Sequence, residues 1–102
     1  MADRVILEGE VFEGEWLTLE QVSSACGVGP EWLLRHIEEG YLPQARSTAG
    51  VWRLTDETLL RARRMRQVER DFDAVPEMAA LVADLLDEVD ALRSRLRRAG
   101  LD

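Results

Sequence analysis

Residues 18–43, TLEQVSSACGVGPEWLLRHIEEGYLP, decide the fold of this chain because they encode two short helices joined by a tight turn. Thr18 and the glutamine three residues later have the spacing of a capping box, and apolar residues at helical spacing follow as far as Gly27. Pro30 suits the first turn of a second helix, where its missing N–H would have no partner, and Gly40 ends the next apolar run. The stretch therefore predicts a helix-turn-helix.

The flanking segments complete a winged version of this unit. Val5–Phe12 mixes β-branched and apolar residues and predicts one short N-terminal strand before the turn residue Gly14. Residues 45–54 contain a Ser-Thr-Ala-Gly turn between two short runs, which predicts the β-hairpin of a wing. Thr55 can cap a third helix that we expect to run to about Arg70. The expected fold is mainly α-helical, with a winged helix-turn-helix domain at 1–70.

A break around residues 71–76 precedes a second part, 71–102, which we expect to form an elbow and a long amphipathic helix. The apolar residues of that helix alternate at spacings of four and three, the heptad pattern of a coiled coil. They are Met78, Val82, Leu85, Val89, Leu92 and Leu96. This stripe could fold back on the third helix within the monomer's core, or it could form the interface of a homodimer. We favour the dimer because a small chain gains stability by burying a broad apolar face.

Length and charge limit the possible functions. The chain has 102 residues, room for one domain and an appended helix, and a formal net charge of −7. An acidic protein lacks general affinity for phosphate and suits a basic partner. Residues 71–90 alone hold seven acidic and no basic side chains. With no apolar run long enough to span a membrane and an acidic N-terminus unlike a signal peptide, we expect a cytoplasmic protein.

Side chains for catalysis or metal binding are scarce. His36 is the single histidine, and Cys26 is the single cysteine. No base stands at a recognisable spacing from a nucleophile, so we expect no catalytic residues and no enzyme activity. One histidine and one cysteine likewise make no metal cluster, and no cofactor motif is present. Cys26 is expected to pack at a helix end.

Several segments resemble a known superfamily and, within it, one family. Trp16–Val22, Cys26–Val28, Glu38–Pro43 and Trp52–Thr55 resemble the MerR type of winged helix-turn-helix, over roughly residues 16 to 70. The short N-terminal strand, Arg70–Pro76 and Leu85–Leu96 extend the likeness to the chaperone modulators of the CbpM family, over almost the whole chain. The order of the motifs and the lack of an effector domain carry this second resemblance.

The resemblance implies a function in chaperone control. CbpM-type modulators bind the J-domain of a DnaJ-like co-chaperone of the CbpA type, block its stimulation of the Hsp70 ATPase and oppose its DNA binding. Such J-domains present basic surface, toward which an acidic protein is steered. The residues we expect to bind the partner are Asp84, Asp87, Glu88 and Asp90 of the last helix, with Glu38 and Glu39 as a second set. The first set could instead be only the solvated side of that helix.

The alternative is a DNA-binding transcription regulator of the MerR type. A helix that reads DNA presents Arg, Asn or Gln to base edges, with positive charge around it for phosphate. The second helix, Pro30 to Glu39, instead offers three glutamates against Arg35 and a neutral His36. Arginines of the wing, Arg46 and Arg53, could still contact a DNA backbone. We therefore favour a protein partner over DNA.

Overall fold

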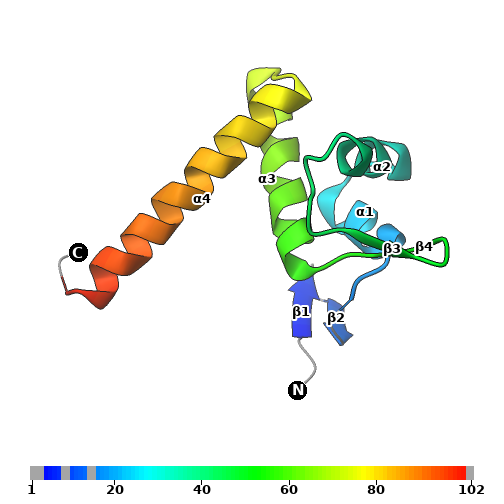
Figure 1. The fold of residues 1–102 in the computed structure, drawn as a ribbon, viewed down its shortest axis with the longest axis horizontal. Coiled ribbons are helices and arrows are strands. Elements are labelled where there is room, and N and C mark those ends of the chain that lie inside the picture. Colours follow the sequence, from blue (N-terminus) through cyan, green and yellow to red (C-terminus); the bar gives the residue numbers. More distant parts are fainter. Residues whose placement is uncertain (1–3, 8–9, 14–15, 101–102) are drawn as a thin grey trace.

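The computed structural model describes residues 4–7, 10–13 and 16–100, and side chains from residue 16 onward. Its elements are, in chain order, β1 (Arg4–Leu7), β2 (Glu10–Glu13), α1 (Leu19–Cys26), α2 (Pro30–Glu38), β3 (Arg46–Thr48), β4 (Val51–Arg53), α3 (Asp56–Phe72) and α4 (Pro76–Arg98). Figure 1 shows α1, α2 and the β3–β4 hairpin gathered on one side of α3, with α4 on the other. The predicted fold class, a mainly helical winged helix-turn-helix with a long C-terminal helix, is confirmed.

The helix-turn-helix forms as its local signals predict. The Thr18 side chain accepts a hydrogen bond from the Gln21 backbone N–H at 3.1 Å, and the Gln21 side chain accepts one from the Thr18 N–H at 2.8 Å. Gly27 ends α1 in the left-handed conformation, with φ of 67°. Pro30 then occupies the first position of α2. Each helix boundary is thus fixed by residues within one turn of it.

The wing is a two-stranded hairpin in which Thr48 pairs with Val51 and Arg46 with Arg53. Its two-residue loop has positive φ at both positions, 52° at Ala49 and 77° at Gly50, as type I′ turns require.

The N-terminal segment differs from expectation. We predicted one strand over Val5–Phe12, but β1 and β2 pair antiparallel, with Ile6 opposite Val11. The single-strand prediction was wrong because the run contains Glu8-Gly9, and glycine in such a run favours a turn. Gly14, the expected turn residue, lies outside the described residues.

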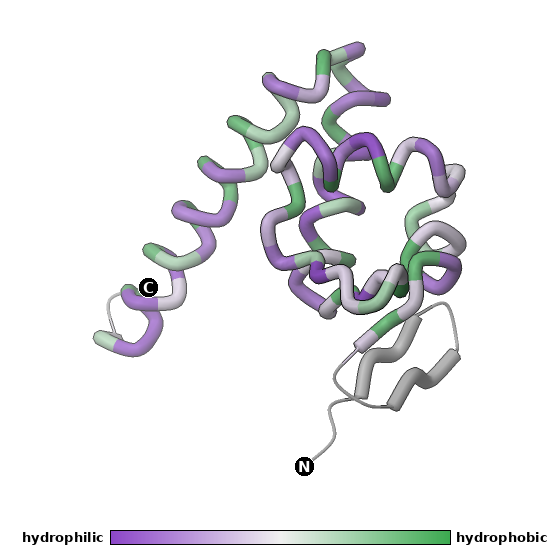
Figure 2. Tube along the Cα trace, turned by 45° about the vertical axis from the view of Figure 1, so that its right-hand side comes forward, coloured by the Kyte–Doolittle hydropathy of each residue, from purple (hydrophilic) through white to green (hydrophobic). Residues whose placement is uncertain are grey.

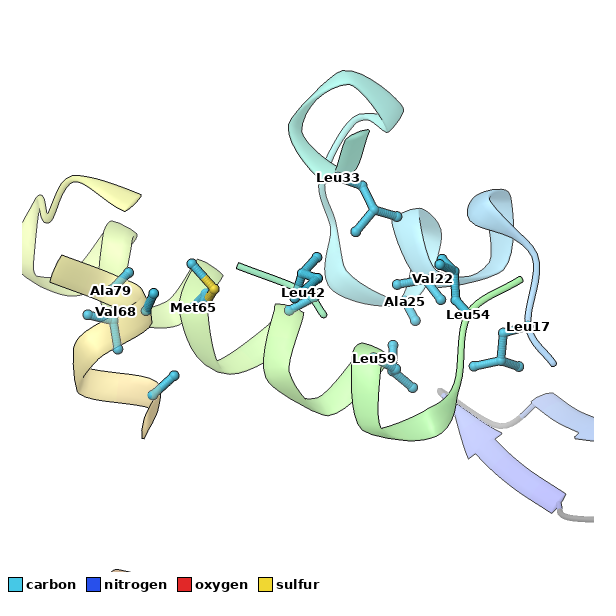
Figure 3. Packing of buried hydrophobic residues seen from close by; sticks show 13 residues of the cluster. Leu17, Val22, Ala25, Leu33, Leu42, Leu54, Leu59, Met65, Val68 and Ala79 are labelled. Carbon is cyan, nitrogen blue, oxygen red and sulfur yellow. The ribbon is translucent and has the colours of Figure 1, made fainter. Parts of the chain in front are cut away.

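The core lies between α3 and the helix-turn-helix. Figure 3 shows Leu59 of α3 converging with Val22 and Ala25 of α1, while Leu33 of α2 closes the cluster from above. Leu59, Val22 and Leu33 are fully buried. Cys26 packs partly buried against this cluster, as its position at a helix end predicts. The core joins α1 and α2 to α3.

The long helix α4 contacts α3 from its N-terminal end as far as Asp90, which pairs with Arg64. Ala79, Ala80 and Ala83 are buried in this contact, and beyond it α4 diverges from α3 and carries the C-terminus away from the domain (Figure 1). The radius of gyration is accordingly 14.7 Å, against about 13 Å for a compact domain of this size.

The heptad stripe faces away from α3. Leu85 follows Ala83 by two residues, which turns it about 200° around the helix from the α3 contact. Five of the six stripe residues are between 39 and 53% exposed, and only Val82 is half-buried against the core. Figure 2 shows hydrophobic residues recurring along the whole of α4. The helix does fold back on α3, as one of the two interpretations expected, but small alanines occupy the contact, and of the stripe only Val82 packs against the core.

Candidate protein-interaction surface

Three of the four predicted acidic residues of α4 lie on its α3-facing side and form ion pairs. Asp84, Asp87 and Asp90 recur every three residues, which keeps them on one side of the helix. Arg61 Nη1 lies 2.9 Å from an Asp84 oxygen and 3.7 Å from Asp87, while Arg64 contacts Asp87 at 2.8 Å and Asp90 at 3.1 Å. We call these three aspartates with the two arginines the α3–α4 ladder. The aspartates are thus more than a solvated helix face.

The ladder holds its arginines firmly and leaves its carboxylates accessible. The Arg61 side chain is 12% exposed, and its Nε donates a hydrogen bond to the Tyr41 carbonyl at 2.6 Å. The aspartate side chains are 58 to 65% exposed. Three aspartates against two arginines leave a net charge of −1 on the ladder. A partner would therefore meet a fixed row of exposed acceptors.

Glu88 is exposed on α4 and stands outside the ladder. It follows Asp87 by one residue, which turns it about 100° around the helix. No ion pair joins it to another side chain in the described part of the chain. The structure thus brings together three of the four residues, and Glu88 extends their charge toward solvent.

A groove of about 370 Å³ lies beside the ladder, and we call it the α3–α4 groove. Its lining residues are Gln44, Glu57, Leu60, Arg61, Arg64, Asp87 and Asp90. Sequence reasoning missed Gln44, Glu57 and Leu60. Leu60 offered one signal, because it is a leucine outside the apolar stripe of α3, and the structure leaves it 62% exposed. Nothing in the sequence marked Gln44.

The second predicted set, Glu38 and Glu39, lies at the C-terminal end of α2. Glu38 is exposed, while Glu39 lines a separate hollow of about 210 Å³ together with Tyr41 and Glu77. Burial raises the pKa of the Tyr41 phenol, and the charges of Glu77 and Glu39 raise it further. This hollow and the α3–α4 groove share no lining residue. The two predicted acidic sets are therefore separate surfaces.

His36 of α2 lies inside the domain and contributes nothing to the outer charge of the helix. His36 is 2% exposed, and its Nδ1 lies 2.7 Å from the Trp32 carbonyl. Its Nε2 lies 2.7 Å from Glu69 Oε2, and the Trp32 indole donates to the other Glu69 oxygen at 3.0 Å. The Trp32 and His36 rings also stack, with centroids 3.6 Å apart. His36 thus ties α2 to α3 from inside because its helix position faces the core.

The wing carries the arginines that a nucleic acid would meet. Arg46 and Arg53 are both exposed and stand directly opposite each other on β3 and β4. Like charges in opposed cross-strand positions are destabilising. We find no compensating ion pair for either among the residues the structure describes.

These elements define a winged helix-turn-helix protein with a long helix appended after the third helix. The chain belongs to the MerR family: the family model described as MerR HTH family regulatory protein matches residues 17–99. No curated protein and no solved structure matches the chain significantly. None of the described helices is both long enough and apolar enough to cross a membrane.

Proposed function

We propose that this MerR-family protein is a chaperone modulator that binds the J-domain of a DnaJ-like co-chaperone of the CbpA type. By covering the basic surface of the J-domain it blocks the stimulation of Hsp70, and it opposes the co-chaperone's DNA binding. The observation that carries the proposal is the row of exposed carboxylates on α4, fixed in place by Arg61 and Arg64.

Electrostatics supports a basic partner at this surface. Glu88 and the three ladder aspartates carry four negative charges against the two arginines, a net of −2. Exposed charge of one sign steers an oppositely charged protein and aligns it before contact. The arginines already order the aspartate side chains. These side chains therefore lose less conformational entropy when a partner binds them.

The same proposal includes a homodimer formed through the α4 stripe. Met78, Leu85, Val89, Leu92 and Leu96 are all at least 39% exposed in the monomer, an unusually long apolar row for a surface. The stripe and the ladder occupy opposite sides of α4, so pairing through the stripe leaves the carboxylates open. Residues 71–90 are acidic and residues 91–98 hold four arginines, so antiparallel helices would bring opposite charges together.

Charge substitutions on α4 test the partner assignment. Replacing Asp87 and Glu88 together by arginine should abolish J-domain binding, measured by titration calorimetry, and restore Hsp70 stimulation. Because Asp87 also pairs with both ladder arginines, Glu88→Arg alone isolates the surface charge from the α3–α4 contact. Glu20→Arg, the same charge change at an exposed position of α1, is the matched control. Unchanged affinity in both α4 variants refutes this surface, and absence of binding by the wild type refutes the function.

The wing supports a second candidate, a DNA-binding regulator. The opposed pair of exposed arginines, Arg46 and Arg53, is a feature that phosphate contact would use. Against it, the outer charges of α2 remain three glutamates to one arginine, because His36 is buried. An electrophoretic shift with a defined operator that persists at about 150 mM salt would favour this candidate over the modulator.

A further inference from the structure

We propose that the α3–α4 groove receives an arginine side chain of the protein partner. The guanidinium would bind Glu57, Gln44 and the free Oδ1 of Asp90, with its alkyl stem on Leu60. This inference deepens the function proposed above and rests on it for the identity of the partner.

The first support is a buried acceptor without a donor. Gln44 lines the groove, and its Oε1 is buried with no hydrogen-bond partner among the described residues. Nearly all buried polar atoms in folded proteins have a partner, so this one requires an explanation. A donor that enters the groove beside Gln44 would supply the missing hydrogen bond after a small rotation of this flexible side chain.

The second support is an excess of acceptors. The carboxylates of Glu57, Asp87 and Asp90 line the groove against the guanidinium groups of Arg61 and Arg64, a net charge of −1. In the described part of the chain, the Glu57 carboxylate forms no ion pair. Asp90 uses one oxygen on Arg64, which leaves Oδ1 open. The groove therefore favours a cation with several donors.

The third support is that the groove is small and contains an apolar residue. Leu60 is 62% exposed although it lines a groove rich in charge. Long cationic side chains cover apolar surface with their stems while the charged end stays among polar groups. A volume of about 370 Å³ lies near the lower end for ligand pockets and suits one or two side chains. Arginine fits better than lysine because its planar fork reaches several acceptors at once.

A titration with the isolated chemical group tests the groove directly. We expect Nα-acetylarginine amide to shift the NMR resonances of Gln44, Glu57 and Leu60 in the full chain, with saturation at millimolar concentration. The citrulline analogue, which has nearly the same shape and no charge, should give at least tenfold weaker binding. Gln44→Leu and Glu57→Gln should each weaken arginine binding severalfold, and Glu20→Gln should not. Equal shifts with both ligands, or shifts spread over other acidic surfaces, would overturn the proposal.

A second measurement separates the groove from the proposed function. If the purified J-domain binds the wild type, Glu57→Gln should weaken binding about tenfold and Glu20→Gln should leave it unchanged. If Gln44→Leu and Glu57→Gln both bind the J-domain with the affinity of the wild type, the proposed arginine site in the groove is overturned and the proposed function still stands. If the J-domain does not bind at all, the function fails, and selective arginine binding at Gln44 and Glu57 still upholds the groove as an arginine site.

Discussion

Replacing Glu69 by leucine should destabilise the domain more than any surface change, because this carboxylate holds two buried donors. Its oxygens accept from the Trp32 indole at 3.0 Å and lie 2.7 Å from His36 Nε2. The Trp32 carbonyl can only accept, so the His36 ring donates to it from Nδ1, and the short contact between Nε2 and Glu69 is a second hydrogen bond of the same ring. With His36 2% exposed, water cannot replace the lost acceptor. Each unpaired buried donor costs about 1 to 3 kcal/mol, so we expect a total loss of about 3 to 5 kcal/mol.

The stability lost by the Glu69→Leu variant is measurable by urea unfolding followed by circular dichroism at a fixed protein concentration. It would remove a large share of the roughly 5 to 15 kcal/mol typical of a domain this size. Glu69→Gln keeps one acceptor, so its free energy of unfolding should lie between those of the leucine variant and the wild type. Glu88→Leu, at an exposed position, should change the free energy of unfolding by at most about 0.5 kcal/mol. A loss below about 1 kcal/mol for Glu69→Leu would show that packing alone joins α2 to α3.

Three further predictions concern α4 and its surroundings. Leu85→Glu, in the middle of the exposed stripe, should convert the proposed dimer to a monomer in sedimentation at about ten micromolar protein; a wild-type monomer there would contradict the dimer. Ala83→Leu overfills the α3–α4 contact and should cost about 1 to 3 kcal/mol, whereas Ala91→Leu, at an exposed position, should cost almost nothing. Tyr41 is the single tyrosine, so ultraviolet titration reports it alone; Glu77→Gln should lower its raised pKa, and an unchanged pKa would remove Glu77 as a cause.

The winged helix-turn-helix was predictable because its signals are local. Thr18, Gly27 and Pro30 each act within one turn of the helix boundary that they set, and the Ala49-Gly50 loop determines its own hairpin type. The same local reasoning failed at the N-terminus, where one apolar run was assigned to a single strand although it contains a turn signal.

The surface of α4 was less predictable because its partners are distant in sequence. Asp87 pairs with Arg64, 23 residues earlier, and no spacing rule within either helix identifies that contact. Ala83 is buried and Leu85 is exposed, although the more hydrophobic residue of a helix usually faces the core. A helix whose small residues face its own domain, while its leucines face solvent, can be recognised only once the packing is known.

That reversal has a functional consequence. If the leucine stripe packed on α3, the aspartates would lie on the solvent side without the arginines that order them. With alanines at the contact, α4 approaches α3 closely enough for Arg61 and Arg64 to reach three carboxylates, and the stripe remains available to a second copy. In the proposed function, self-association and binding at the ladder would then use opposite sides of one helix. Leu85→Glu should therefore abolish the proposed dimer while each monomer keeps its J-domain affinity; loss of both properties in this variant would contradict this division of α4.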